Sequence, residues 1–420
     1  MNSILSLDRI RFLLSRLGDR LWVKPLVVCL ISVSAVFAAK LAQDMGVQQY
    51  VPKVGAESLE TLLQIMASSM LVIATFSVSS MVSAYSAASS TATPRSFSLV
   101  VSDDASQNAL STFVGAFIFS IVALTATLND YFEVAGLFVL FVITVFVFAI
   151  VILTFIHWVD RIARLGRIGS TIDKVEIATV SAFKRRLAQP TLGGIGVKGV
   201  KKGQAIYSDQ TGYVQHIDIA ALQACAKEAD VTVLLNVLPG TFATPRRALA
   251  YVNTNANDTA ELNIKALIRT FQIGGERLFE EDPRFGLVVL SEIAGRALSP
   301  AVNDPGTAID VIGTLLRLLL MWEETDDIQE VDPKCDRVAV PEICVNDMFE
   351  DAFTAIARDG AGVVEVGVRL QKALYCLAGA KNANIRSAAE AHAGLALKRA
   401  KKALALDEDY EMVKNAGKQQ

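Results

Sequence analysis

The stretch VAGLFVLFVITVFVFAIVILTFIHW, residues 134–158, decides the fold of this chain. It contains no Asp, Glu, Lys or Arg, and its bulky apolar side chains would cover every face of a helix. About 20 consecutive apolar residues are enough for a helix to cross a bilayer. A helix that is apolar all round suits contact with lipid, so we expect residues 134–158 to span a membrane.

Three further stretches meet the same requirement, and all of them precede residue 134. Their approximate bounds are residues 25–42, 59–88 and 109–128. Charges are absent from the interiors of the spans, since Lys40 and Glu60 sit at span ends, where a long side chain can reach the interface. We therefore expect residues 25–160 to form an α-helical transmembrane domain with four spans.

Basic residues flank these spans unevenly. The 24 residues before the first span hold five Lys or Arg, and Arg161, Arg164, Arg167 and Lys174 follow the fourth span. Only Lys53 lies between spans one and two, and no basic residue lies between spans three and four. Cytoplasmic loops carry an excess of Lys and Arg, so we expect both termini in the cytoplasm.

Composition divides the rest of the chain. Residues 1–24 mix an apolar face with arginines, which is typical of an amphipathic helix on the inner leaflet. Residues 161–203 are expected to form a juxtamembrane helix and a Gly-rich linker. Residues 204–257 indicate a small β-rich subdomain of barrel or sandwich type, and residues 258–420 a helical subdomain. The chain after the spans is thus expected to be an α+β cytoplasmic domain with C-terminal helices.

The Gly-rich linker contains Gly194-x-Gly196-x-x-Gly199, which formally matches the dinucleotide-binding fingerprint. That fingerprint requires a strand before it, a helix after it and a surrounding βαβ unit. None of these is evident here, so we interpret the glycines as part of a linker.

Helix signals are clear in the C-terminal part of the chain. Asn303-Asp304-Pro305 predicts a helix start, with Asp304 as N-cap and Pro305 in the first helical position. A two-helix hairpin is expected at the end, over residues 361–380 and 384–404.

The second span carries polar side chains along one side. At 100° per residue, Thr61 falls in one arc with the candidate pore-lining residues Gln64, Ser68, Thr75, Ser79, Ser83, Ser86 and Ser90. An unpaired hydroxyl in hydrocarbon costs free energy, so we expect this stripe to avoid lipid. Two interpretations stay open. The hydroxyls could let helices pack closely and bond across the interface, or they could line a water-filled path around an oligomer axis.

Charged residues follow the stripe. Pro94 is expected to end the second span, which places Arg95 at its cytoplasmic end with Asp103 and Asp104 on the same loop. These three residues could form a capped turn with an interfacial arginine. They could also form a ring of charge that attracts ions at a pore mouth.

Several function classes lack support in the sequence. The formal net charge of −3 gives no reason to expect nucleic acid as a partner. Three His and five Cys show no zinc-binding spacing or C-x-x-C pair, and no Walker A or Gly-x-Ser-x-Gly motif is present. We expect no enzymatic activity, no metal and no cofactor. The expected partners are the lipid bilayer, other copies of the chain, and ions or small solutes.

Three blocks of the sequence resemble a known family. The first is SSTATPR at 89–95, followed by Asp103, Asp104 and Gln107 and by TFVGAF at 112–117. The second is EDPRFG at 281–286, and the third is RALSPAVNDPGTA at 296–308. They resemble the predicted bacterial membrane proteins of the domain-of-unknown-function 2254 family. The resemblance spans most of the chain and implies a multi-pass protein of the bacterial inner membrane, without implying an activity.

The second and third blocks also supply a possible cytoplasmic site. Its candidate residues are Asp282, Arg284, Arg296, Asn303 and Asp304. They could bind a ligand, or they could serve as helix caps and as ion pairs between helices.

These features together favour an oligomeric inner-membrane channel or transport pore lined by the second span. The cytoplasmic domain would act as its vestibule or gate. The scarcity of acids within the spans favours passive conduction over proton-coupled transport. The alternative is a membrane-anchored sensor or scaffold whose cytoplasmic domain binds a ligand or a partner.

The four-span topology predicts which single cysteines can be labelled from outside the cell. In a cysteine-free background, Gly55→Cys and Asn129→Cys should react with a membrane-impermeant maleimide, because both positions lie in external loops. Ser6→Cys, Ser98→Cys and Gln210→Cys should react only after the membrane is permeabilised. External labelling at position 98 would overturn the topology.

Overall fold

The computed structural model describes most of the chain. The described residues are 23–43, 52–91, 93–96, 99, 104–162, 167–197, 203–254, 263–323 and 334–418. The expected interfacial helix over residues 1–24 lies almost entirely outside them. The chain forms two compact units, one that ends at Thr171 and one that begins at Ile172. We call them the bundle unit and the α+β unit.

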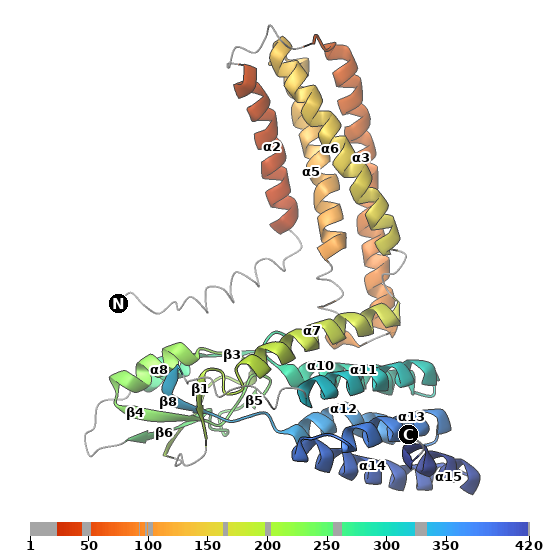
Figure 1. Cartoon of the computed structure of the whole chain (residues 1–420). Coiled ribbons are helices and arrows are strands. Elements are labelled where there is room, and N and C mark those ends of the chain that lie inside the picture. The colour runs from red at the N-terminus through yellow and green to blue at the C-terminus, as the bar shows by residue number, and fades with distance from the viewer. Residues whose placement is uncertain are drawn as a thin grey trace. The chain divides into compact units, whose positions relative to one another are not determined.

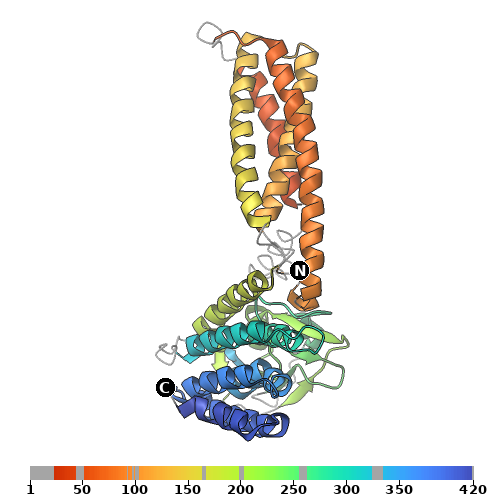
Figure 2. The same ribbon diagram turned by 90° about the vertical axis from the view of Figure 1, so that its right-hand side faces the viewer.

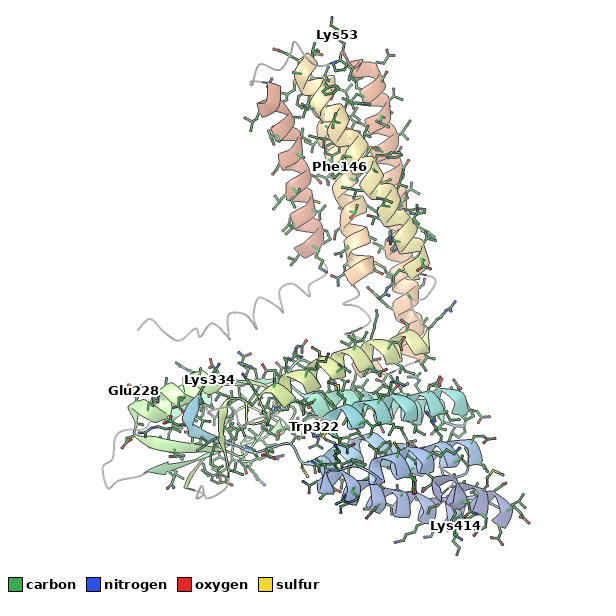
Figure 3. All side chains as sticks on the ribbon, in the orientation of Figure 1. Lys53, Phe146, Glu228, Trp322, Lys334 and Lys414 are labelled. Atoms are coloured by element: carbon green, nitrogen blue, oxygen red, sulfur yellow. The ribbon has the colours of Figure 1, made fainter. Side chains whose placement is uncertain are left out.

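The bundle unit consists of long apolar helices that run side by side (Figures 1 and 2). They are α2 (Val23–Gln43), α3 (Ala56–Thr91), α5 (Asp104–Leu128) and α6 (Val134–Ile162), with the 3-10 turn η2 (Pro94–Ser96) between α3 and α5. Helix α5 packs against each of the other three. The four predicted spans coincide with these helices, and α3 ends before Pro94 as expected. Lys53, in the connection before α3, lies at one end of the bundle (Figure 3).

Small residues allow close approach in this bundle. A Cβ atom on Gly115 of α5 would overlap the side chain of Val28 of α2, so the glycine lets the two helices meet. Ser111, Ala116 and Ser120 of α5 are also buried, so the small-residue spacings of α5 (Ser111 with Gly115, Ala116 with Ser120) lie in the packed interior. The same spacing in α2, Ser34 with Ala38, faces away from the other helices.

Aromatic contacts fix α6 to its neighbours. Trp158 is buried, and its ring meets Phe76 of α3 and Phe113 of α5 edge-on, with centroids 6.0 and 6.1 Å away. The opposite side of α6 is open, and Phe146 there has 65% of its surface exposed. This wide apolar surface agrees with the lipid contact expected for residues 134–158.

Five of the described helices are long and apolar enough to cross a membrane. Four of them are the bundle helices. The fifth is α11 (Pro305–Glu323), where half of the most apolar stretch is buried by protein. It packs against other helices of the α+β unit, which explains its apolar character without a membrane. Four spans therefore stays our prediction.

The α+β unit contains two sheets. Its strands are β1 (Gly194–Gly196), β2 (Gln204–Ile206), β3 (Gly212–Ile217), β4 (Val231–Leu235), β5 (Phe242–Ala243), β6 (Ala250–Thr254), β7 (Phe271–Gly274) and β8 (Cys335–Val340). One sheet has the order β1-β8-β4-β6-β2 and is mixed, and the other has the order β5-β3-β7 and is antiparallel. The two share one core with Leu222 and Ala226 of α8 (Ile219–Glu228). The expected barrel or sandwich is not confirmed by this strand order.

Two expectations about the sheet region were wrong. Strands β7 and β8 lie in residues 258–420, which were expected to be helical, and β1 lies in the glycine run interpreted as a linker. Strand β8 runs parallel to both β1 and β4. Its partners come from far earlier in the chain, so the local pattern of residues 335–340 could not indicate the pairing.

Helices form the rest of the α+β unit, and the long ones stack in successive layers (Figure 1). They are α7 (Ile168–Ala188), α9 (Ile264–Ile268), α10 (Pro283–Ala297), α11, α12 (Val345–Asp359), α13 (Val364–Ala378), α14 (Ala383–Ala403) and α15 (Asp407–Asn415), followed by the 3-10 turn η3 (Ala416–Lys418). The predicted C-terminal hairpin corresponds to α13 and α14. Helix α7 contacts α11, where the ring of Phe183 meets that of Trp322 with centroids 4.9 Å apart.

The predicted helix start at Asp304 is confirmed. Helix α11 begins at Pro305, and the Asp304 carboxylate accepts hydrogen bonds from the backbone N–H and the hydroxyl of Thr307, at 3.1 and 2.6 Å. These bonds lower the pKa of Asp304 below its ordinary value. Asp304 is therefore a helix cap.

Removing this cap should destabilise the protein modestly. We expect Asp304→Ala to cost about 0.5–2 kcal/mol, while Asp304→Asn, which can still accept a bond from the Thr307 N–H, should retain most of the stability. Because the folded-state pKa is lowered, the Asp304 contribution is present at neutral pH and lost as the pH falls through that pKa. Thermal unfolding of the purified full chain at pH 7 and at acidic pH measures both effects. Equal melting temperatures for wild type and Asp304→Ala would contradict the cap.

Candidate functional site

The polar stripe of α3 faces away from the other helices of the bundle unit. The opposite face of α3 is buried against its neighbours through Leu63, Met66, Met70 and Met81. Every stripe residue whose side chain is described is exposed: Thr61, Gln64, Ser68, Thr75, Ser79, Ser83 and Ser86. Packing against other helices of the same chain therefore does not explain the stripe.

Several stripe hydroxyls are satisfied within their own helix. Ser68, Thr75 and Ser83 donate to the backbone carbonyls four residues earlier, at 2.9–3.0 Å. This corrects the expectation that the hydroxyls lack partners in hydrocarbon, because Ser and Thr can bond to the i−4 carbonyl of a helix. The side chain of Gln64 makes no hydrogen bond to any described residue and is exposed. Its amide is thus the strongest reason for water or a second protein surface at this face.

The predicted pore-mouth residues are only partly described. Arg95 lies in η2 with its side chain exposed. Asp103, and the side chains of Ser90 and Asp104, lie outside the described residues. The ring of charge therefore stays a prediction.

A second candidate site lies in the α+β unit, in a cavity of about 450 Å³. Its walls come from the ends of several elements: the C-terminal part of α7, the turn after β4, the starts of α10 and α12, and the segment between β8 and α12. The predicted site residues Asp282 and Arg284 both line it. The charged lining residues are Arg186, Arg247, Arg277, Asp282, Arg284, Glu342 and Asp347.

Asp282 is a buried acid held by one arginine. Its Oδ2 accepts a 2.7 Å hydrogen bond from Nε of Arg277, and Asp282 itself is only 3% exposed. Burial raises the pKa of Asp282, and the bond from Arg277 opposes that rise. Arg277 also lies over the ring of Phe285, 5.1 Å from its centroid.

The turn after β4 presses against this acid. Gly240 has φ of +90°, a conformation that favours glycine, and a Cβ atom there would overlap the Asp282 carboxylate. Thr241 N–H donates to the Leu238 carbonyl across the turn at 3.0 Å. Pro239 and Gly240 thus form a turn that closes one wall of the cavity.

Arg284 joins two helices. From α10 its guanidinium donates to Asp347 and Asp351 of α12, at 2.6 and 2.7 Å. Burial lowers the pKa of Arg284, but these two carboxylates more than offset that effect, so the pKa is raised. Arg284 therefore forms an ion pair between two helices, which is one of the two roles expected for it.

Arg186 has no such partner. It is 4% exposed, its Nη1 is buried without a hydrogen-bond partner, and no described carboxylate lies within ion-pair distance. Burial lowers the pKa of Arg186 to about 10, although the charges of Glu281 and Asp282 oppose the change. Sequence analysis missed this residue. The helical period of α7 could have indicated it, because Arg186 falls on the same helix face as the buried residues Val175, Thr179 and Phe183.

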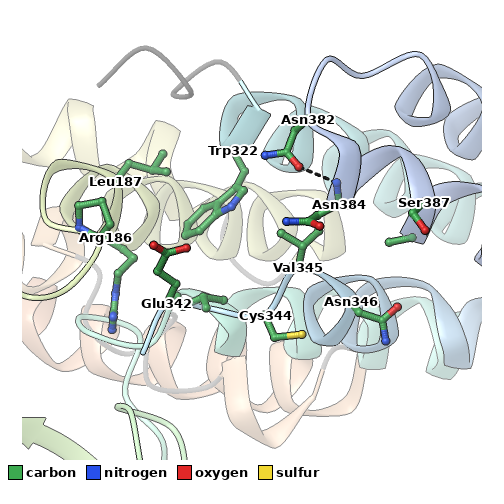
Figure 4. Close-up of a pocket in the computed structure, with 13 residues that line it drawn as sticks. Arg186, Leu187, Trp322, Glu342, Cys344, Val345, Asn346, Asn382, Asn384 and Ser387 are labelled. Carbon is green, nitrogen blue, oxygen red and sulfur yellow. Dashed lines mark hydrogen bonds between the residues drawn. The ribbon is translucent and has the colours of Figure 1, made fainter. Parts of the chain in front are cut away.

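A neighbouring cavity of about 560 Å³ shares the Arg186 wall. Figure 4 shows Arg186 and Glu342 on one side of it, and Asn346 and Asn384 on the other. The segment Glu342-Ile343-Cys344 lines both cavities. Arg186 and this segment therefore connect two hollows in the same unit.

The remaining predicted residues do not join the cavity. Arg296, Asn303 and Asp304 lie at the other end of α10 and at the start of α11, and they line neither hollow. Asn303 has a positive φ of 50° immediately before the Asp304 cap. The structure thus splits the predicted set into a cavity pair, Asp282 and Arg284, and a helix-start group.

Comparison with known proteins identifies similar sequences. The family described as "Predicted membrane protein (DUF2254)" matches residues 18–375. Uncharacterized proteins of Mycobacterium bovis and Mycobacterium tuberculosis are 27% identical to the chain over 164 residues, which are 37% of this chain and 32% of each relative. The chain thus spans about a third of the length of these curated relatives. No solved structure matches.

The Arg277–Asp282 pair predicts a double-variant result. Arg277→Met should cost about 3–5 kcal/mol, because it leaves a buried carboxylate without its partner. Arg277→Met combined with Asp282→Asn should recover a large part of that loss, since no buried charge then remains. Melting temperatures of the wild type, both single variants and the double variant give the coupling. Strict additivity of the two single effects would contradict the pairing.

Proposed function

Because the chain belongs to the DUF2254 family of predicted membrane proteins, we propose that it forms an oligomeric pore in the bacterial inner membrane. Helix α3 lines this pore, both termini lie in the cytoplasm, and the α+β unit serves as vestibule or gate. The pore conducts ions or small solutes passively, and no catalytic step is part of the proposal.

One observation carries this proposal: the polar face of α3 is the face that the bundle leaves open. The buried face holds Leu63, Met66 and Met70, and the exposed face holds Gln64, Ser68 and the later hydroxyls. A side-chain amide without a partner is costly in hydrocarbon. Gln64 is therefore best placed in water or against another copy of the chain. A ring of α3 helices around a water-filled axis provides both surroundings.

The surfaces of the other helices support the same arrangement. Helix α6 exposes large apolar side chains such as Phe146, Leu153 and Ile156, which suit lipid. A ring that turns α3 inward and α6 outward matches each surface to its surroundings. Such a ring uses head-to-tail contacts that close by rotation.

The lining would not be uniformly polar. Val72 and Val82 fall within the same arc as Ser68 and Ser86, and both are more than half exposed. Apolar constrictions can gate a pore by excluding water. The mixed face therefore favours a path that opens and closes over one that is permanently wet.

A second candidate function is a membrane-anchored sensor or scaffold. It is favoured by the cavities of the α+β unit and by the buried Arg186 that lines both of them. In this case the α3 stripe would be an interface between copies, and the ligand or partner would bind the α+β unit.

Thiol modification and flux measurements distinguish the two. If α3 lines a pore, Ser79→Cys, Ser83→Cys and Ser86→Cys should react with small soluble thiol reagents, while Met81→Cys, on the buried face, should not. A charged reagent on Ser83→Cys should change ion flux in reconstituted liposomes. Arg95→Glu should shift the preference between cations and anions, because charge at a pore mouth sets the local ion concentration.

A matched pair of bulky substitutions supplies the control. Ser83→Phe should reduce flux at least severalfold, whereas Ser69→Phe, exposed on α3 but outside the arc, should leave flux close to wild type. Unreactive stripe cysteines together with loss of assembly in Ser83→Phe would instead indicate a packed interface. A folded oligomer without flux above protein-free liposomes, across voltage, tension and pH, would contradict the pore.

A further inference from the structure

The α+β unit holds a cation that its own structure does not neutralise. Arg186 is 4% exposed, and one of its terminal nitrogens has no hydrogen-bond partner. Leaving a buried charged donor unsatisfied costs more than leaving a neutral one. Buried polar groups in folded proteins are normally satisfied by protein, ordered water or an ion, so this nitrogen calls for a partner from outside the chain.

The surroundings of Arg186 favour an anion. The 450 Å³ cavity is also lined by Arg247, whose side chain is exposed and makes no ion pair with the described residues, and by Arg277 and Arg284. The last two already hold acids, Arg277 through Asp282 and Arg284 through Asp347. Among the described lining residues, the positive charges without an ion pair are therefore those of Arg186 and Arg247, and the acid without one is Glu342, which leaves an excess of positive charge.

Two helices add to the positive potential. Helices α10 and α12, each 15 residues long, begin at the cavity wall with Pro283 and with Cys344 as its N-cap. Neither helix has a side-chain hydrogen bond at its N-cap. First-turn N–H groups and the helix dipole favour an anion at such an end. Each end already carries one acid, Asp282 at the N-cap of α10 and Asp347 in the first turn of α12, and these two acids are held by Arg277 and Arg284.

We propose that this cavity binds a soluble, phosphate-bearing small molecule, with the phosphate on Arg186 and Arg247 contributing from the rim. The planar guanidinium of arginine matches the oxygen geometry of phosphate and can donate two parallel bonds to it. The cavity volume of about 450 Å³ lies in the range of small-molecule pockets, roughly 300–1,000 Å³. A phosphate with a small organic group therefore fits the space and the charge.

Binding also couples the cavity to its neighbour. Arg186 and residues 342–344 line both hollows. A ligand that draws the Arg186 guanidinium toward one hollow changes the wall of the other. The site belongs to the α+β unit alone, so this inference does not depend on the pore.

Thermal unfolding of the full chain in nanodiscs of zwitterionic lipid tests the site. Inorganic phosphate and pyrophosphate, at matched ionic strength against chloride, should raise the melting temperature saturably. Arg186→Met should raise the half-saturating concentration about tenfold or more, since charged hydrogen bonds contribute about 1.5–3 kcal/mol. Arg247→Gln, a change on the exposed rim that leaves the core intact, should weaken binding in the same direction.

Arg358→Met is the matched control, because Arg358 is exposed, pairs with its neighbour Asp359 and does not line the cavity. It should bind phosphate like wild type. If Arg186→Met does not fold, Arg247→Gln decides the result. Equal shifts with phosphate and chloride, or unchanged phosphate binding in Arg247→Gln and Arg186→Met, would overturn the site. Stabilisation by nanodiscs containing phosphatidic acid but not by phosphate would overturn the soluble ligand.

Discussion

Hydrocarbon offers no hydrogen bonds, and the bundle unit is built around that constraint. Its helices satisfy their backbone internally, and Ser68, Thr75 and Ser83 satisfy their hydroxyls on the same helix. Close packing then depends on shape, with Gly115 admitting α2 and Trp158 joining α6 to its neighbours. On the open face of α3, this constraint leaves the amide of Gln64 without a hydrogen-bond partner among the described residues. This amide points to the face where a second copy of the chain or water belongs.

The α+β unit deals with buried charge in two different ways. Asp282 and Arg284 are placed in ion pairs that hold the α10 start against the connection from β7 and against α12. Such pairs fix the positions of the elements they join more than they add to the free energy of unfolding, because desolvation offsets most of their attraction. Arg186 is buried in the same region without a pair. That contrast, between charges that are neutralised and one that is not, distinguishes a binding group from a structural one.

The sequence predicted what depends on local chemistry. The bundle helices follow from apolar runs, and the α11 start follows from Asp304 and Pro305. Hydroxyl bonding to the i−4 carbonyl is also local, and the stripe should have been interpreted with it in view. Strands β1 and β8 pair although they lie far apart in the sequence, and the local alternation of apolar and polar residues does not indicate such a pairing. Asp282 and Arg284 were identified as site residues, whereas Arg186 was missed, although its place in step with the buried positions of α7 was a signal for it.

The oligomeric state of the full chain in nanodiscs tests the pore most directly. An axial path lined by α3 requires several copies, since one bundle leaves this face open on its own surface. Native mass spectrometry should therefore show a closed oligomer of one defined stoichiometry, with the stripe of α3 protected from lipid-soluble labels. A stable, folded monomer with Gln64 and Ser83 facing lipid would contradict the pore.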